Sequence, residues 1–227
     1  MHTLVLFDID GTLVRGGPAK VAFETAMLET YGTAGAVDSF DFSGKTDPQI
    51  ARELLTDAGL EDAAVDAGLA ELWDRYIGEF EAHIGENPMT LLPGVAGLIE
   101  ALDAEPGVAL GLVTGNIIRG ARVKLGSVGL DGCFTVGGYG SDHEIRERLP
   151  AIALERAFEA WGVRFPAESA VIVGDTPRDV ECGKHQGTRT VAVATGRIPR
   201  EWLETTGADA VFDDFSDIAS VMKALLP

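Results

Sequence analysis

The chain has 227 residues, a hydrophobic content of 46% and a formal net charge of −18. This length and composition are enough for one large or two smaller domains with a sizeable core. The acidity argues against a nucleic-acid partner, which normally binds a basic patch. No stretch approaches the roughly 20 apolar residues that cross a bilayer, and no basic leader with a cleavage site is present. We therefore expect a cytoplasmic protein with no nucleic-acid or membrane partner.

The first element predicted in chain order is a buried strand over Leu4–Phe7, which runs directly into the sequence DIDGT at residues 8–12. From about Arg15 to Thr90 we find no convincing strand. Helical patterns occupy that region, around Lys20–Thr30, Pro48–Ala58 and Ala63–His83. An insertion of about 75 residues is too long for a simple crossover between strands, so it predicts a helical cap domain.

Beyond the insertion, short apolar runs alternate with amphipathic helical patterns. The predicted strands are Val108–Val113, Phe134–Val136, Ala170–Val173, Thr190–Ala194 and Ala210–Phe212. The helical patterns include Ile117–Val128, Arg148–Trp161 and Phe215–Leu226. Such an alternation is typical of a parallel sheet covered on both faces. We predict an α/β fold, a doubly wound parallel sheet formed by residues 1–14 and 91–227, with an all-helical cap formed by residues 15–90.

Three of the predicted strands end in polar residues. These strand-end residues are Asp8, Asp10, Thr114, Asn116, Asp175 and Asp179. In open α/β sheets, ligands bind beyond the carboxyl ends of the strands, where the strand order reverses. We therefore expect these side chains to converge on one crevice.

Several carboxylates in one crevice repel one another. Two unit charges ~4 Å apart repel by roughly 4 kcal/mol at an effective dielectric constant near 20. Protonation or a cation must relieve this repulsion, and Mg²⁺ suits an oxygen-rich site that also admits a phosphate oxygen. A simpler alternative is that the aspartates cap helices. It remains open in part for Asp10 and Asp175, but Asp8 lies inside the strand end.

Three motifs together resemble the haloacid dehalogenase superfamily of phosphohydrolases. They are DIDGT at residues 8–12, VTGN at 113–116 and GDTPRD at 174–179. Their order, with a helical insertion after the first motif, is similar to subclass I of the superfamily and to its phosphoglycolate phosphatase-like and β-phosphoglucomutase-like members. The resemblance covers essentially the whole chain.

The resemblance implies a role for each motif residue. Asp8 resembles the nucleophile that becomes an aspartyl phosphate, and Asp10 the general acid that protonates the leaving alcohol and then activates water as a base. Asp8, the main-chain carbonyl of Asp10, and Asp175 would hold Mg²⁺, with Asp179 supporting them. The expected phosphoryl and substrate contacts come from the Thr114 hydroxyl, Gly11, Thr12, Gly115 and Asn116.

The superfamily also places a basic residue between the second and third of these motifs, to neutralise the phosphoryl group and the nucleophile. This chain has no Lys-Pro pair there, but it offers Arg146 and Arg148 at a predicted helix start. We prefer Arg146, and we regard Lys124 and Lys184 as more distant alternatives.

In the predicted cap, the sequence SGKTDPQI at residues 43–50 precedes a helix with Pro48 in its first turn. Lys45 is either a substrate-specificity residue or an exposed lysine in an ordinary capping turn. Trp73, Tyr76 and Phe80 follow helical spacing, which favours the core of the cap over substrate stacking.

The function predicted from these features is Mg²⁺-dependent hydrolysis of a small phosphorylated metabolite, by a monomer or homodimer. A phosphomutase would use the same site, and a phosphonatase would need a cap lysine such as Lys45 for a Schiff base. A 2-haloacid dehalogenase shares the aspartate nucleophile but has no acid two residues later, so Asp10 argues against it. Intact motif residues argue against a non-catalytic binding protein.

Overall fold

A computed structural model describes residues 3–226, and these residues contain a parallel six-stranded sheet with the order β5-β4-β1-β6-β7-β8. The strands are β1 (Thr3–Phe7), β4 (Val108–Thr114), β5 (Val136–Tyr139), β6 (Ala170–Gly174), β7 (Arg189–Val193) and β8 (Ala210–Phe212). β1 pairs with both β4 and β6, so the first and third motifs meet at the centre of the sheet.

Helices cover both faces of this sheet because successive side chains of each strand point to opposite sides. Along β1, Val5 and Phe7 face one hydrophobic cluster, and Leu4 and Leu6 face another. The first face carries α4 (Val95–Asp103), α5 (Ile118–Ser127) and α9 (Ile218–Leu225), and the second carries α6 (Leu149–Trp161) and α7 (Pro177–Gln186). The doubly wound α/β fold is thereby confirmed.

Some local details differ from the sequence expectations. The strand expected over Phe134–Val136 begins instead at Val136 and continues to Tyr139. A glycine is needed there, because a Cβ at Gly138 would lie 2.1 Å from the carbonyl oxygen of Leu149 at the start of α6. Elements that the expected patterns did not name are α4, α7, α8 (Arg200–Thr205) and the short 3₁₀ turns Arg146–Arg148 and Ala167–Ser169.

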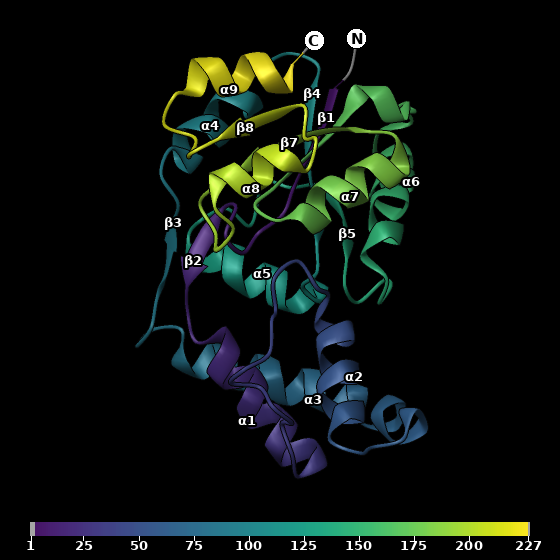
Figure 1. Cartoon of the computed structure of the whole chain (residues 1–227). Coiled ribbons are helices and arrows are strands. Elements are labelled where there is room, and N and C mark those ends of the chain that lie inside the picture. Colours follow the sequence, from purple (N-terminus) through teal and green to yellow (C-terminus); the bar gives the residue numbers. More distant parts are fainter. Residues whose placement is uncertain (1–2, 227) are drawn as a thin grey trace.

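The inserted region forms α1 (Ala19–Tyr31), α2 (Asp47–Asp57) and α3 (Asp62–His83). Figure 1 shows these three helices gathered beyond the carboxyl ends of the strands, away from α4 and α9. The expected positions of the three helices were correct to within one residue at every end. None of the helices in the described residues is long and apolar enough to cross a membrane.

The expectation of no strand between residues 15 and 90 was wrong at both ends of the insertion. β2 (Val14–Gly16) and β3 (Met89–Leu91) form an antiparallel two-stranded sheet, with Val14 opposite Leu91 and Gly16 opposite Met89. Three-residue strands are too short to show a period of two. They pair because the chain enters and leaves the insertion side by side.

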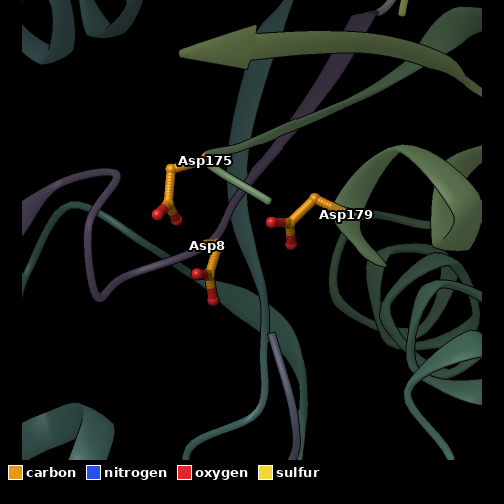
Figure 2. A group of neighbouring side chains, drawn as sticks. All are labelled: Asp8, Asp175 and Asp179. Carbon is orange, nitrogen blue, oxygen red and sulfur yellow. The ribbon is translucent and has the colours of Figure 1, made fainter. Parts of the chain in front are cut away.

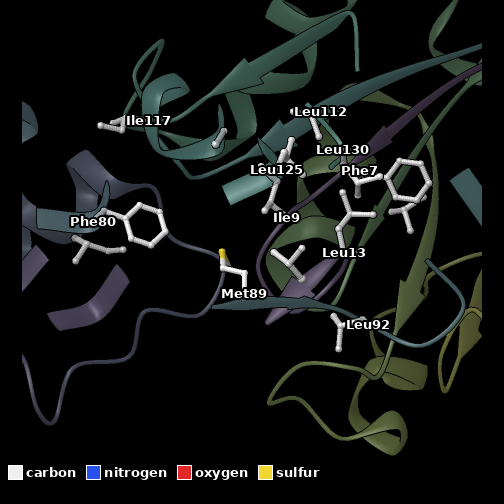
Figure 3. Close-up of a cluster of buried hydrophobic side chains, with 14 of the residues drawn as sticks. Phe7, Ile9, Leu13, Phe80, Met89, Leu92, Leu112, Ile117, Leu125 and Leu130 are labelled. Atoms are coloured by element: carbon white, nitrogen blue, oxygen red, sulfur yellow. The ribbon is translucent and has the colours of Figure 1, made fainter. Parts of the chain in front are cut away.

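The apolar interior of the insertion is continuous with that of the sheet. Phe80 of α3 belongs to the same buried cluster as Ile117, which precedes α5, and Phe7 of β1 (Figure 3). Tyr76 and Phe80 are almost fully buried, as expected for the cap core, and Trp73 stacks on Phe23 of α1. The insertion therefore rests on the sheet domain through apolar contact as well as through its two connecting strands.

Candidate active site

A cavity of about 480 Å³ separates the inserted helices from the carboxyl ends of β1, β4 and β6. The sheet side contributes Asp8, Asp10, Asn116, Arg146 and Asp175 to its lining. The inserted region contributes apolar side chains, among them Phe23 and Tyr76, as well as charged ones, among them Lys20, Lys45 and Asp47. Four of the six strand-end residues thus meet in one cavity, whereas Thr114 and Asp179 lie outside its lining.

Three carboxylates crowd together at the floor of this cavity. Ligand oxygens of Asp8, Asp175 and Asp179 all lie within 4.8 Å of one another, and Figure 2 shows the three side chains. Burial, opposed by the Arg146 guanidinium and reinforced by the charges of Asp179 and Asp10, raises the pKa of Asp8 to about 6. Burial and the charges of Asp179 and Asp8 raise the pKa of Asp175 well above its usual value. The floor therefore favours either protons or a cation.

Arg146 supplies one positive charge to this group. Its Nη2 lies 3.1 Å from Asp8 Oδ1 and also pairs with Asp179. The Arg146 side chain is only 4% exposed, whereas Arg148 and Lys184 are exposed. Of the basic residues considered from the sequence, Arg146 is the one that the structure places against Asp8.

The donor set fits a hard divalent cation such as Mg²⁺. Asp179 is already engaged by Arg146 and by the Thr176 amide and hydroxyl, at 3.0 and 2.7 Å. This leaves Asp8 and Asp175 as carboxylate ligands, with Asp179 behind them. In the turn that follows β1, the backbone hydrogen bonds end on the carbonyl oxygens of Ile9 and Val14. The carbonyl oxygen of Asp10 is therefore available as a third metal ligand.

Two glycines make room for Asp175. A Cβ at Gly196 would lie 1.7 Å from Asp175 Oδ2, and one at Gly11, where φ is +84°, would lie 2.4 Å from the same atom. The Thr12 hydroxyl donates to Asp175 Oδ1 over 3.2 Å. Gly11 and Thr12, expected from the sequence to contact substrate, thus lie where they fix the position of a carboxylate.

Asp10 lies outside the group of three crowded carboxylates, although its charge still acts on Asp8. Its Oδ2 accepts hydrogen bonds from Lys124 Nζ at 2.6 Å and from Asn116 Nδ2 at 2.7 Å. The Asp10 side chain is 46% exposed and lines the cavity. Two carboxylates from one strand end therefore occupy different environments, a geometry suited to two different chemical roles.

The second motif contributes backbone and amide groups to the cavity wall. Gly115 and Asn116 line it, whereas Thr114 is fully buried behind them and its hydroxyl accepts from Asn116 Nδ2 at 2.8 Å. Among the described residues, Asn116 Oδ1 and Arg146 Nε are buried without a hydrogen-bond partner. Both residues line the cavity, so a bound ligand or water is the natural partner for these atoms.

Lys45, for which the sequence left a substrate-specificity role and an ordinary capping turn open, lines the cavity, but its charge is already paired. Its Nζ forms an ion pair with Glu53 and lies 4.3 Å from the centre of the Phe40 ring. The neighbouring Thr46 and Asp47 dock the inserted region on the sheet domain. The amide of Asp47 donates to Gly115 O, and its Oδ2 accepts from the Ile117 amide, both at 2.8 Å.

Sequence reasoning missed the positions of Lys124 and Asp47 in the site. A signal for Lys124 was present, because it shares the apolar face of α5 with Ala121 and Leu125, all three of them buried. A lysine on a buried face needs a partner inside the protein. Asp47 gave no comparable signal, because its contact with Ile117 joins segments 70 residues apart.

Comparisons with known proteins agree with this geometry. The model of the haloacid dehalogenase-like hydrolase family matches residues 2–187. The chain is 30% identical to a phosphoglycolate phosphatase of Rhodospirillum rubrum, over 96% of this chain and 90% of that protein. It is also 30% identical to an N-acetylmuramic acid 6-phosphate phosphatase of Pseudomonas putida, over 98% and 96% of the two chains.

A solved hydrolase from Pseudomonas syringae shares the fold, with a TM-score of 0.74 at 21% identity and full coverage of both chains. This likeness supports the fold, and the family match and the two phosphatases identify the family. The chain is therefore a phosphoric monoester hydrolase and belongs to the haloacid dehalogenase-like hydrolase family.

Proposed function

We propose that this protein is a Mg²⁺-dependent phosphatase that hydrolyses a small phosphomonoester through an aspartyl phosphate on Asp8. One observation carries the proposal: Asp8 and Asp10 leave the same strand end, yet Asp8 lies among Arg146 and two further carboxylates while Asp10 lies apart from them. A nucleophile and a proton donor need this separation of environments.

In the first proposed step, a carboxylate oxygen of Asp8 attacks phosphorus and the bond from phosphorus to the ester oxygen breaks. Protonated Asp10 gives its proton to that oxygen, so the substrate leaves as a neutral alcohol. Arg146, which already pairs with Asp8, is placed to balance the charge of the transferring phosphoryl group.

In the second step, water attacks phosphorus of the aspartyl phosphate and gives a proton to the Asp10 carboxylate. The bond from phosphorus to the Asp8 oxygen breaks, inorganic phosphate leaves, and both aspartates return to their starting states. Asp8, Asp175 and the Asp10 carbonyl would hold Mg²⁺, with Asp179 supporting them. When bound, the ion would supply positive charge that neutralises these carboxylates and the phosphoryl oxygens.

We propose that residues 15–90 act as the cap that selects the substrate and excludes water during these steps. A cavity of about 480 Å³ suits a small metabolite. The two phosphatase relatives make phosphoglycolate and N-acetylmuramic acid 6-phosphate the first substrates to test. The pairing of Lys45 with Glu53 disfavours a Schiff base there, and hence the phosphonatase alternative.

The test is phosphate release from a panel of phosphomonoesters, headed by those two, with Mg²⁺ and with EDTA. We expect release that depends on Mg²⁺ and is lost in Asp8→Asn, a nearly isosteric variant that removes the nucleophile. Rapid quenching of the wild type should also trap an acid-stable phosphorylated protein that Asp8→Asn does not form. Activity retained by Asp8→Asn, or equal activity in EDTA, would show that the proposal is wrong.

A further inference from the structure

The contact between Lys124 and Asp10 is the most specific feature of the cavity to which the proposed steps give no role. Lys124 lies on α5, and its side chain is only 5% exposed. Its Nζ donates to Asp10 Oδ2 at 2.6 Å, and Asn116 Nδ2 donates to the same oxygen at 2.7 Å. In the described part of the chain, Asp10 Oδ1 has no side-chain hydrogen-bond partner. One oxygen of the carboxyl group is held twice, and the other is free.

The position of Lys124 is not explained by the folding of α5. Its neighbours on the buried face are Ala121 and Leu125, and an apolar residue there would pack without the cost of burying an ammonium group. Among the described residues, the Lys124 side chain forms an ion pair with Asp10 alone. A buried charge directed at one carboxylate oxygen of a cavity residue indicates a role at that oxygen.

Groups on the inserted helices close this arrangement from the other side. Asp47 and Tyr76 line the same cavity as Lys124, and Lys124 is close enough to Asp47 to oppose the burial that raises its pKa to about 6. Lys124 therefore lies between a carboxylate of the sheet domain and one of the insertion. Its ammonium group balances the charge of both Asp10 and Asp47 but forms a hydrogen bond only with Asp10.

We propose that Lys124, together with Asn116, is a positioning residue for proton transfer by Asp10, an inference that rests on the proposed function. By holding Oδ2, the two donors leave Oδ1 to carry the proton. Oδ1 gives this proton to the ester oxygen as its bond to phosphorus breaks. In the second step Oδ1 takes a proton from the attacking water. Lys124 itself exchanges no proton in this sequence.

A leaving-group comparison tests this role. An alkyl phosphomonoester needs a proton at its leaving oxygen, whereas p-nitrophenyl phosphate releases a stable phenolate that does not. The second step is the same for both substrates, so the comparison uses the first step, measured as release of the alcohol or phenolate in a single turnover. We expect Lys124→Met to lower this rate on the best alkyl substrate at least tenfold more than on p-nitrophenyl phosphate, with KM changed less than the rate. Lys124→Arg keeps a donor and should restore part of the loss. Equal losses of the first-step rate on both substrates would overturn the proposal.

A double-mutant cycle supplies a second readout. If Lys124 acts through Asp10, Lys124→Met should cost little in an Asp10→Asn background, because the interaction is already lost. Multiplicative losses would mean an independent, structural role and would contradict the proposal. Lys223→Met, which removes an exposed lysine of α9, is the matched control. Thermal unfolding of each variant shows whether it is folded. If Lys124→Met does not fold, the leaving-group comparison is made with Lys124→Arg, whose partial loss should also be larger on the alkyl substrate.

The wild type and Asp8→Asn are measured beside these variants on the same two substrates. Absence of phosphate release by the wild type, or release that survives Asp8→Asn, contradicts the proposed function itself. If the wild type depends on Asp8 but Lys124→Met loses the first-step rate equally on both substrates, only the positioning role is contradicted. The two failures are therefore distinguishable.

Discussion

Arg146 Nη2 lies 3.1 Å from Asp8 Oδ1, and the same guanidinium pairs with Asp179 across the floor of the cavity. All three side chains are less than a tenth exposed. One arginine thus joins the proposed nucleophile to the residue that supports the metal ligands. Because the group is buried, the loss of the arginine leaves charges that water cannot screen.

We expect Arg146→Met to lower kcat by about 10²–10³ and stability by about 3–5 kcal/mol. Arg146→Lys keeps the charge but loses the planar, multiply bonded guanidinium, so we expect an intermediate kcat. Steady-state kinetics and urea unfolding measure the two effects. Arg148→Met, two residues away and exposed, is the control. A kcat within threefold of wild type in Arg146→Met would contradict this assignment.

The stability of the metal-free chain should fall as the pH rises through about 6. Burial raises the pKa of Asp8 to about 6 and that of Asp175 well above its usual value, so in the folded state both groups hold protons that the unfolded chain has already lost. This contribution is present at low pH and is lost above the folded-state pKa. The measurement is Tm against pH in EDTA.

Added Mg²⁺ should oppose this loss, because metal ligands must be deprotonated. We expect the Tm increase caused by Mg²⁺ to be larger at pH 7.5 than at pH 5. Asp175→Asn should reduce both the pH dependence in EDTA and the response to Mg²⁺. A Tm increase that is the same at both pH values would argue against a metal at these carboxylates.

Gly196→Ala should weaken Mg²⁺ binding without unfolding the protein. The added methyl group would lie 1.7 Å from Asp175 Oδ2, so the carboxylate must move. We expect the Mg²⁺ concentration for half-maximal activity to rise at least tenfold. Gly132→Ala is the matched control, because a Cβ there meets nothing within 4 Å. Equal Mg²⁺ dependence in the two variants would contradict the placement of Asp175.

Asp47→Asn should stabilise the protein at pH 7.5. Burial, with Lys124 opposing it, raises the pKa of Asp47 to about 6, so its ionised form costs stability above that pH. From the shift, the gain is at most about 3 kcal/mol and should vanish near pH 4. The asparagine can still accept from the Ile117 amide.

Asp47→Ala removes that acceptor and provides the comparison. We expect it to raise KM and to expose the α2 region to limited proteolysis, whereas Asp47→Asn does not. Urea unfolding at pH 7.5 and 4.5, with proteolysis at pH 7.5, separates the charge of Asp47 from its hydrogen bond. Lower stability of Asp47→Asn at pH 7.5 would show that the charge is favourable there.

Regular, local signals made most of the fold predictable. Apolar strands that end in polar residues identify the sheet, because an apolar run and the polar residue after it are neighbours in the sequence. The β2–β3 pair was missed because each strand is three residues long and its partner lies more than 70 residues away. The continuation of β5 through glycines was missed because the need for Gly138 comes from the backbone of Leu149, at the start of α6.

The candidate site shows the same division. The sequence placed Asp8, Asp10 and Asp175 in one crevice, which follows from strand ends meeting at one edge of a sheet. It could only prefer Arg146 over Arg148, because the two differ in which face of a short turn they occupy. It could not tell that Lys45 is paired with Glu53, nor that Lys124 reaches Asp10, because these contacts depend on side-chain packing between distant segments.

The antiparallel pairing of β2 with β3 has a mechanical consequence. Two separate linkers would each bend and twist on their own, and the cap would have many directions of travel. Because Val14–Gly16 is hydrogen-bonded in register to Met89–Leu91, a rotation of one linker carries the other with it. The paired linkers thus restrict the movement of the inserted region to rotation about nearly one axis. In the closure that we propose, such a joint would return the same side chains of residues 15–90 to the same place above Asp8, so the accuracy of the cap would be a property of its hinge.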